Sequence, residues 1–314
     1  MESKNFLQAC GCIALHASLL STFSPLGAGA AKQTSALVTP APAPAGVSIV
    51  GVEWIRIAGP SGSSMLGAVA RPHGAGPFPA VLILHGTHGF AQQYVRLAKE
   101  FANHGVLAVA ACWFSGGSGA GSRFITRIEC PDAPPLSMAS SPTAQMAIAA
   151  LVAGVRQLPG TDSRRLALFG HSRGAGAALN YILRRGDVSA LVIDSAGYPD
   201  DVISKASQVT VPVLIFHGTL DSPADGGSEM TSVQRARTFE AALRREQRTV
   251  EAQYYDAGHN GIFTSSVQFT DAVRRAASFL RTHPPDSGSL QHHPPSGRRS
   301  PNQTLQPTAG RFDV

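Results

Sequence analysis

Charged residues are scarce in this 314-residue sequence and make up only 15% of it. Such a low content argues against long solvated helices and against disorder along the whole chain. The formal net charge is +6, but the basic residues are scattered in short pairs such as Arg164-Arg165 and Arg274-Arg275. We therefore expect a generally basic surface and no nucleic-acid partner.

The sequence also lacks a long uninterrupted apolar run. The stretch from Cys10 to about Leu26 is broken by a histidine and two serines, which predicts no stable membrane insertion. Lys4 precedes this stretch and Ala28-Gly29-Ala30 follows it, the order typical of an export signal over residues 1–30. The Leu7–Cys10 segment resembles a lipoprotein box, but it precedes the apolar stretch. We expect a periplasmic or secreted protein.

Cysteine is scarce, with four residues in the chain. Cys10 and Cys12 lie in the predicted signal, which leaves Cys112 and Cys130. In an oxidising compartment these two can form a disulfide, worth about 3 kcal/mol in the chain-entropy model. Two unrelated buried thiols are the alternative.

Patterns for metals and phosphate groups are missing as well. His85 and His88 are spaced like metal ligands, but no carboxylate or cysteine nearby completes a site. No Gly-Lys-Ser/Thr follows a glycine-rich loop, and Gly174-Ala-Gly176 lacks the third glycine of a dinucleotide loop. We expect neither a metal nor a cofactor.

The remaining chain divides into three parts by composition. Residues 31–46 are rich in Ala, Pro, Thr and Ser and predict a linker, residues 47–282 a folded domain, and residues 283–314 a disordered tail. In the domain, apolar strands alternate with helices, which indicates a mainly parallel sheet with helices on both faces. The predicted strands are 47–57 and 65–70 (a hairpin), 80–84, 106–111, 166–169, 191–193, 213–216 and 250–255, and the predicted helices are 91–103, 146–158, 174–183, 233–245 and 267–280.

A Gly-x-Ser-x-Gly pattern stands between a predicted strand and a predicted helix. In Gly170-His-Ser172-Arg-Gly174 the sharp turn would expose the serine hydroxyl at the sheet edge. Gly170 and Gly174 would let strand and helix approach closely, and we expect Gly176 to let the helix pack tightly on its neighbours. The pattern predicts that Ser172 is a nucleophile.

A serine hydroxyl needs a base, and in this kind of sheet the acid and then the histidine follow the serine in the chain. His259 lies in a glycine-flanked loop between the last strand and the last helix, so we predict it as the base. His217 ends a strand, where a packed, hydrogen-bonded role is expected. Asp221 follows that strand and is the predicted acid, with Asp225 and Asp194 as alternatives.

Two backbone N–H groups are needed to stabilise an oxyanion. We predict those of Arg173, directly after the nucleophile, and Thr87, in the loop after the strand 80–84. Apolar side chains near these loops predict an acyl pocket. Its expected members are Phe90, Trp113, Phe114 and Ile262.

Residues 65–282 resemble the dienelactone hydrolase-like branch of the α/β-hydrolase superfamily. The resemblance rests on Leu-His-Gly after an early strand, Gly-His-Ser-Arg-Gly, Phe-His-Gly-Thr-Leu-Asp and Ala-Gly-His-Asn-Gly. It implies the α/β-hydrolase fold, with a mainly parallel central sheet and helices on both faces. Dienelactone hydrolases are expected to use cysteine as nucleophile, whereas position 172 is serine, so dienelactone is a doubtful substrate.

Together these features predict a serine hydrolase that cleaves small or polymeric carboxylic esters through an acyl-enzyme. An exported peptidase or acyltransferase with the same triad is one alternative, and a non-catalytic binding protein is another. The sequence fixes neither the acyl group nor the oligomeric state.

Overall fold

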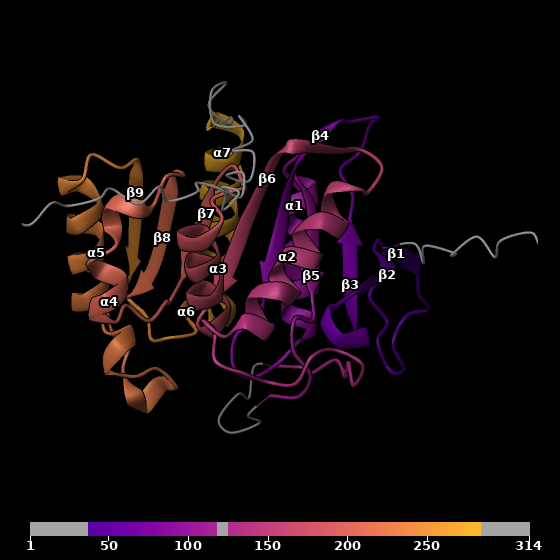
Figure 1. Cartoon of the computed structure of the whole chain (residues 1–314), viewed down its shortest axis with the longest axis horizontal. Helices are drawn as coiled ribbons and strands as arrows, with labels where there is room; N and C mark the ends of the chain where they lie inside the picture. Colours follow the sequence, from indigo (N-terminus) through magenta and orange to yellow (C-terminus); the bar gives the residue numbers. More distant parts are fainter. Residues whose placement is uncertain (1–36, 118–124, 284–314) are drawn as a thin grey trace, which may run out of the picture. The chain divides into compact units, whose positions relative to one another are not determined.

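A computed structural model describes residues 37–117 and 125–283. The predicted signal at residues 1–30 and the tail from residue 284 lie outside the described residues. The described chain forms one nine-stranded sheet in the order β1-β2-β3-β5-β4-β6-β7-β8-β9 (Figure 1). The strands are β1 (Val38–Pro40), β2 (Glu53–Ala58), β3 (Ser64–Ala70), β4 (Phe78–Leu84), β5 (Leu107–Ala111), β6 (Thr161–His171), β7 (Leu191–Asp194), β8 (Val213–Gly218) and β9 (Val250–Tyr255).

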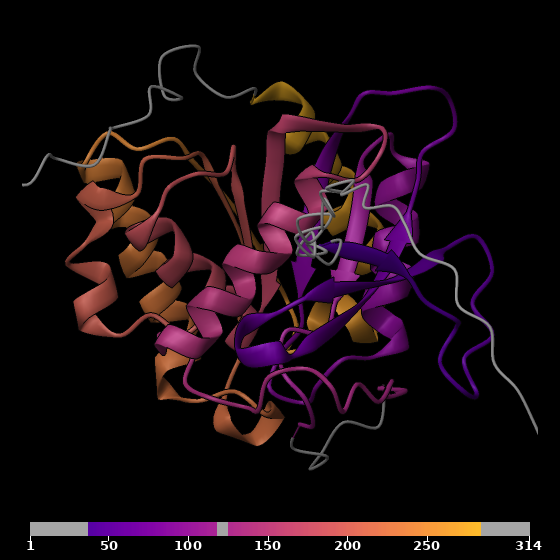
Figure 2. The same cartoon turned by 45° about the vertical axis from the view of Figure 1, so that its right-hand side comes forward.

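The sheet is antiparallel at one end and parallel through the rest. β1, β2, β3 and β5 pair antiparallel in that order, which confirms the predicted β2–β3 hairpin. From β5 through β4 to β9 every pair is parallel, so these strands all end at the lower edge in Figure 1. Figure 2 shows β1 and β2, in indigo, turned away from the direction of the central strands, as sheet twist requires.

Helices cover both faces of this sheet, which confirms the predicted fold class. α1 (Gln92–Asn103) and α7 (Ser266–Thr282) lie behind it in Figure 1, and α2 (Pro142–Arg156) and α3 (Arg173–Arg184) lie in front. No helix in the described ranges is both long and apolar enough to cross a membrane. The remaining helices are α4 (Asp200–Ile203), α5 (Val233–Arg245), α6 (Gly261–Thr264) and the 3-10 turns η1 (Pro60–Gly62), η2 (Ala206–Gln208), η3 (Pro223–Asp225) and η4 (Glu229–Thr231).

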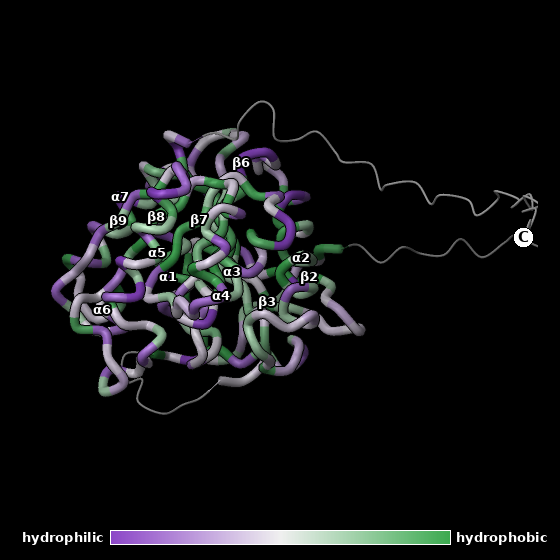
Figure 3. The backbone as a smooth tube through the Cα atoms, turned by 60° about the vertical axis from the view of Figure 1, so that its left-hand side comes forward, coloured by the Kyte–Doolittle hydropathy of each residue, from purple (hydrophilic) through white to green (hydrophobic). Residues whose placement is uncertain are grey.

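The core follows the continuous apolar runs of the sequence. All residues of β5, β7 and β8 are buried, as are those of β4 after Phe78, because helices cover these strands on both sides. Figure 3 shows apolar backbone positions, in green, gathered along β7 and β8. The edge strand β9 buries fully only Tyr255.

Several boundaries differ from the predictions: β2 begins at Glu53 and not at residue 47, and β6 spans Thr161–His171 where we expected 166–169. β1 pairs with β2 inside residues 31–46, where we expected a linker, because Val38 and Thr39 can add to an exposed sheet edge. α2 begins at Pro142 and not at residue 146. Ser141 accepts a hydrogen bond from the Ala144 N–H, and the proline fits the first helical position.

Candidate active site

Ser172 occupies a strained turn between the last residue of β6 and the first residue of α3. Its φ and ψ angles are 53° and −116°, a conformation that L-residues rarely adopt. A Cβ atom at Gly170 would lie 2.4 Å from the Gly174 oxygen, and one at Gly174 would lie 2.2 Å from the Leu84 oxygen. Both glycines are therefore sterically required, and together they aim the serine at the sheet edge.

The imidazole of His259 lies between Ser172 and Asp221. Its Nε2 is 2.8 Å from Ser172 Oγ, and its Nδ1 is 2.7 Å from Asp221 Oδ2. The carboxylate can only accept, so the Nδ1–H donates to it and Nε2 is left to accept the serine proton. The His259 and Asp221 residues are only 4% and 7% exposed, so little water competes for these contacts.

Backbone contacts hold the acid and base loops together. The loop that carries Asp221 follows β8, and the loop that carries His259 follows the neighbouring β9. The Leu220 N–H donates to the Ala257 oxygen at 3.0 Å. A Cβ atom at Gly218 would lie 2.3 Å from that same oxygen, so only glycine allows this close approach. Two residues 38 positions apart are thereby brought into contact.

Two further groups hold the Asp221 carboxylate. Thr231 Oγ1 lies 2.9 Å from Oδ1, and His217 Nε2 lies 3.3 Å from Oδ2 and 2.6 Å from the Thr231 oxygen. Burial by itself would raise the pKa of Asp221, but hydrogen bonds from His217 and His259 lower it below the usual value. Asp221 is therefore a carboxylate at neutral pH. His217 takes the packed, hydrogen-bonded position that we expected.

The two alternative acids are placed elsewhere. Asp225 is exposed at the end of η3, where its carboxylate lies 3.5 Å from the Ser222 hydroxyl. Asp194, at the end of β7, contacts a different histidine. Neither carboxylate is hydrogen-bonded to His259 in the described residues, so Asp221 alone can orient that imidazole.

Asp194 and His171 form a second buried pair beside the nucleophile. Asp194 Oδ2 lies 2.6 Å from His171 Nδ1, and His171 Nε2 lies 3.1 Å from Asn260 Oδ1. The amide oxygen can only accept, so Nε2 carries a proton. Burial lowers the pKa of His171 to about 3 and raises the pKa of Asp194 to about 7. A neutral ring that is protonated on Nε2 must accept at Nδ1, so below about pH 7 Asp194 carries a proton and donates it there.

The predicted oxyanion-donor residues, Thr87 and Arg173, line the same cavity as Ser172. Arg173 is the first residue of α3, so its N–H has no acceptor within the helix. The Thr87 N–H likewise has no protein acceptor in the described part of the chain. The two residues contact each other, since Arg173 Nε donates to Thr87 Oγ1 at 3.1 Å.

Tyr94 of α1 holds the loop that carries Thr87. Its hydroxyl accepts the Gly86 N–H at 2.9 Å and donates to His88 Nε2 at 2.6 Å. Burial lowers the pKa of His88 to about 3, so that ring is neutral and can accept. The buried Tyr94 hydroxyl thus holds the Thr87 loop in place at both Gly86 and His88.

A cavity of about 360 Å³ opens beside Ser172. Its walls come from α3, from the segment after β7, from α4 and from the loop before α2. Apolar and small residues dominate these walls, with Met138, Ala139, Gly176, Leu179, Gly197 and Val202 among them, and Thr87 and Arg173 line the end at the serine.

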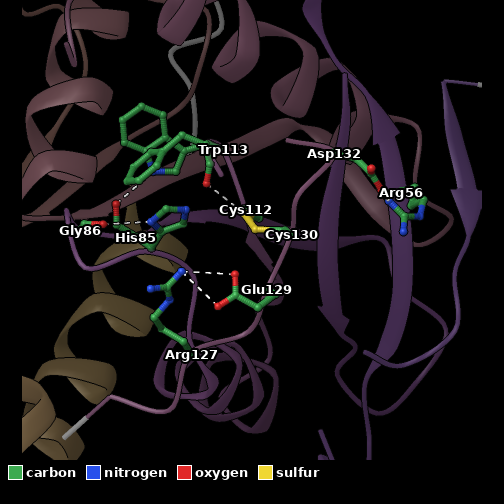
Figure 4. Close-up of a disulfide and its surroundings, with 10 residues drawn as sticks. Arg56, His85, Gly86, Cys112, Trp113, Arg127, Glu129, Cys130 and Asp132 are labelled. Carbon is green, nitrogen blue, oxygen red and sulfur yellow. Dashed lines mark hydrogen bonds and ion pairs between the residues drawn. A yellow bond between two sulfur atoms is a disulfide. The ribbon is translucent and has the colours of Figure 1, made fainter. Parts of the chain in front are cut away.

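The predicted pocket residues do not line this cavity, so that prediction was wrong. Phe90, Trp113, Phe114 and Ile262 are all at most 2% exposed. The Trp113 Nε1–H donates to the His85 oxygen at 3.0 Å (Figure 4). The ring centroids of Phe114 and His85 lie 4.4 Å apart. These side chains support the loop from inside, and an apolar residue after a strand has the same sequence signature in either role.

Cys112 and Cys130 form a disulfide, shown in yellow in Figure 4. It joins the end of β5 to a loop segment that contacts the chain before α1. There the Ile128 N–H donates to the Phe90 oxygen at 2.9 Å. Ion pairs between Arg127 and Glu129 and between Arg56 and Asp132 flank the bridge.

Tyr94, Thr231 and Asn260 also hold the site, and no sequence pattern had indicated them. Asn260 had a local signal, because it is the neighbour of His259. The other two carry none, since their hydroxyls reach the site from α1 and η4. In residues 37–117 and 125–283, no group of three or more His, Cys, Asp or Glu side chains is placed to hold a metal ion.

Solved structures share this fold. The esterase Pf2001 from Pyrococcus furiosus aligns with 74% of this chain and 92% of its own, at a TM-score of 0.57 and 16% identity. A dienelactone hydrolase from Anabaena variabilis aligns with 74% and 99%, at 0.53 and 16%. Dipeptidyl peptidase 4 from Porphyromonas gingivalis aligns with 74% and 35%, at 0.55 and 18%.

The sequence itself carries a family signature. No curated protein matched it. The profile of the dienelactone hydrolase family matches residues 65–281, well over half of the chain, and covers Ser172, Asp221 and His259. Both the family and the fold support a hydrolase of the α/β type. The chain belongs to the dienelactone hydrolase family.

Proposed function

We propose that this protein is a serine hydrolase that cleaves carboxylic esters through an acyl-enzyme. The observation that carries the proposal is the pair of contacts made by His259, at 2.8 Å to Ser172 Oγ and 2.7 Å to Asp221 Oδ2. These are the distances at which a base can take the proton of a nucleophile and be oriented by an acid.

In the first half-reaction, Ser172 Oγ attacks the ester carbonyl carbon while its proton moves to His259 Nε2. The carbonyl oxygen becomes an oxyanion, which the N–H groups of Thr87 and Arg173 stabilise. The carbon–oxygen bond to the alcohol then breaks, and His259 returns the proton to the leaving oxygen. In the second half-reaction, a water molecule attacks the acyl carbon and gives its proton to His259. The bond between that carbon and Ser172 Oγ breaks, His259 returns the proton to Oγ, and the carboxylic acid leaves.

A fluorophosphonate probe and a matched variant test the proposal. The probe should label Ser172, because labelling requires an activated hydroxyl. Hydrolysis of p-nitrophenyl esters should fall by about 10⁶-fold in Ser172→Ala, the scale of triad loss. Unlabelled protein without esterase activity would favour the alternative of a binding protein.

A peptidase with the same triad is the second candidate, and the fold likeness to a dipeptidyl peptidase favours it among the alternatives. Matched p-nitrophenyl esters and p-nitroanilides of one acyl group separate the two. If the protein is an esterase, the p-nitrophenyl ester should react faster than the p-nitroanilide. The rate ratio should exceed the difference in intrinsic reactivity of the two bonds by at least about 10³-fold. Anilide cleavage at a comparable rate would favour the peptidase.

We also propose that residues 1–30 direct export and that the mature protein acts in the periplasm or outside the cell. The Cys112–Cys130 pair supports this, because disulfides persist in oxidising compartments. Cell fractionation and mass spectrometry of the mature N-terminus test it. Full-length protein recovered only from the cytoplasm would contradict it.

A further inference from the structure

Gly170, Gly174 and Gly176 lie close to Ser172 in the chain, and they differ in how tightly other atoms pack against them. Added Cβ atoms at Gly170 and Gly174 would collide with backbone at 2.4 and 2.2 Å. At Gly176 the nearest atom to an added Cβ is the Ala139 Cβ, at 3.9 Å. We expected Gly176 to permit tight packing of α3, and that expectation was wrong.

Glycine at position 176 destabilises the helix α3, and no close contact requires it there. Gly176 is the fourth residue of a 12-residue helix, where glycine is about 1 kcal/mol less favourable than alanine. It does not have a positive φ, so its backbone does not require glycine. What it faces is the cavity beside Ser172. The absent side chain therefore leaves space in that cavity.

A second glycine lines another wall of the same cavity. An added Cβ at Gly197 would make only ordinary contacts, the nearest at 3.6 Å from Met230 Cβ. Val202, Leu179 and Met138 supply apolar surface around these two positions. Met138 is 73% exposed, an unusual position for a methionine, and it forms part of the cavity wall.

The proton path decides which half of an ester lies in this cavity. The leaving oxygen must be within reach of His259 Nε2 to receive its proton. The cavity contains Ser172 and both oxyanion-donor residues, but no described residue of the His259 loop lines it. It therefore extends away from the leaving group, on the acyl side of the carbonyl.

We propose that this cavity binds the acyl group, and that Gly176, with Gly197, sets its width so that the enzyme prefers esters of medium-length apolar acids. The inference rests on the proposed function. A liquid water molecule occupies about 30 Å³, so 360 Å³ holds roughly a dozen groups of that size, which is room enough for an acyl chain of about eight carbons. Gly176 is a specificity-determining residue, and it has no part in the chemistry.

The test compares kcat/KM for p-nitrophenyl octanoate and acetate in four proteins. The wild type should favour octanoate by at least about 10-fold, and Gly176→Leu should lower the octanoate-to-acetate ratio by at least about 10-fold. Gly197→Val narrows another wall and should lower the ratio even if Gly176→Leu fails to fold. Thr238→Leu, which adds a leucine on the exposed face of α5, is the control and should keep the wild-type ratio.

Two further measurements distinguish a narrowed cavity from a general loss of folded enzyme. Gly176→Ala should raise the Tm by about 2–4 °C, because glycine serves no packing purpose there. Acetate esters of a short and a long alcohol test the other side of the ester bond. The ratio of their kcat/KM values should be the same in Gly176→Leu as in the wild type.

An unchanged octanoate-to-acetate ratio in both narrowing variants, or a change with alcohol length instead, would overturn the acyl assignment. A wild type that hydrolyses no ester and resists the fluorophosphonate would instead overturn the proposed function itself.

Discussion

Two histidine–aspartate pairs lie within the same site, and they differ in charge and direction. His259 and Asp221 are 2.7 Å apart, and His171 and Asp194 are 2.6 Å apart. The rings are neighbours, with centroids 5.5 Å apart. The pKa of Asp221 is lowered and that of Asp194 is raised to about 7. Burial raises the pKa of Asp194, whereas hydrogen bonds from His217 and His259 outweigh burial and lower that of Asp221, so the two carboxyls titrate in different pH ranges.

The direction of each ring completes the difference. His259 Nε2 faces the Ser172 hydroxyl, while His171 Nε2 faces the Asn260 amide oxygen. The first ring can accept a proton from a nucleophile. The His171 ring donates its Nε2 proton to Asn260, which lies in the loop that carries His259. His171 therefore positions that loop.

Exchange of the two histidines for glutamine tests this difference most strongly. His259→Gln should lower kcat by about 10⁶-fold, because no other side chain among the described residues is hydrogen-bonded to Ser172 Oγ. His171→Gln should lower it by no more than about 100-fold, since it removes only support. Both are measured with a p-nitrophenyl ester on protein whose fold is checked by circular dichroism. Equal losses would erase the distinction between the pairs.

Amide substitutions of the two acids give the next largest contrast. Asp221→Asn should lower kcat by about 10⁴-fold, because an amide that donates to His259 imposes the wrong tautomer. Asp194→Asn should cost less than about 100-fold. Asparagine can donate to His171 Nδ1 as the protonated acid does. A larger loss in Asp194→Asn would show that Asp194 works as a carboxylate.

The Asp194→Asn variant should also change how stability depends on pH. Between pH 4 and 6.5 the wild-type pair holds one proton in both states, on Asp194 when folded and on the histidine when unfolded. The pair then adds almost no slope. Burial lowers the pKa of folded wild-type His171 to about 3, against 6.5 when unfolded. The same burial should act in the variant, so its unfolded state binds more protons and its stability should rise with pH.

The free energy of unfolding of Asp194→Asn should therefore rise more steeply than that of wild type, by about 2 kcal/mol between pH 4.5 and 6.5. Urea unfolding at several pH values measures it. Asp201→Asn, which removes an exposed carboxylate paired with Lys205, is the control and should follow the wild-type slope. Parallel wild-type and Asp194→Asn curves would place the buried proton on His171.

The smallest expected effect concerns the link between the pairs. Asn260→Ala leaves the buried His171 Nε2–H without its acceptor and should cost about 1–3 kcal/mol of stability. It should also lower kcat by about 10-fold with little change in KM, because the His259 loop loses an anchor. Thr264→Ala, which removes a hydroxyl that donates to the Asn260 backbone, is the matched control. Equal effects of the two would indicate loop damage alone.

The sequence predicted the parallel sheet and the triad positions because both have local signatures. Continuous apolar runs such as that of β4 mark strands covered on both faces. Ser172 stands in a strand–turn–helix motif, and His259 in a glycine-flanked loop after the last strand. Asp221 has no signature of its own, since Asp194 and Asp225 also stand at or after the ends of strands. Only the contact with His259 separates the three.

The acyl pocket could not be predicted in the same way. Phe90, Trp113, Phe114 and Ile262 are apolar and near the catalytic loops in the chain, yet they face the core. The cavity is lined instead by residues with no chemical signal, such as Gly176 and Gly197, because a cavity is defined by what several segments leave empty. Tyr94 and Thr231 were missed for a related reason, since each reaches the site by a tertiary contact.

The sequence by itself determined where strands, helices and the nucleophile turn lie, since apolar periodicity and glycine sterics act over a few residues. Tertiary structure alone decided which aspartate meets which histidine, which of these carboxyls keeps its proton, and where space remains beside Ser172. Those outcomes depend on burial and on hydrogen bonds between segments distant in the chain, and no local pattern encodes either quantity.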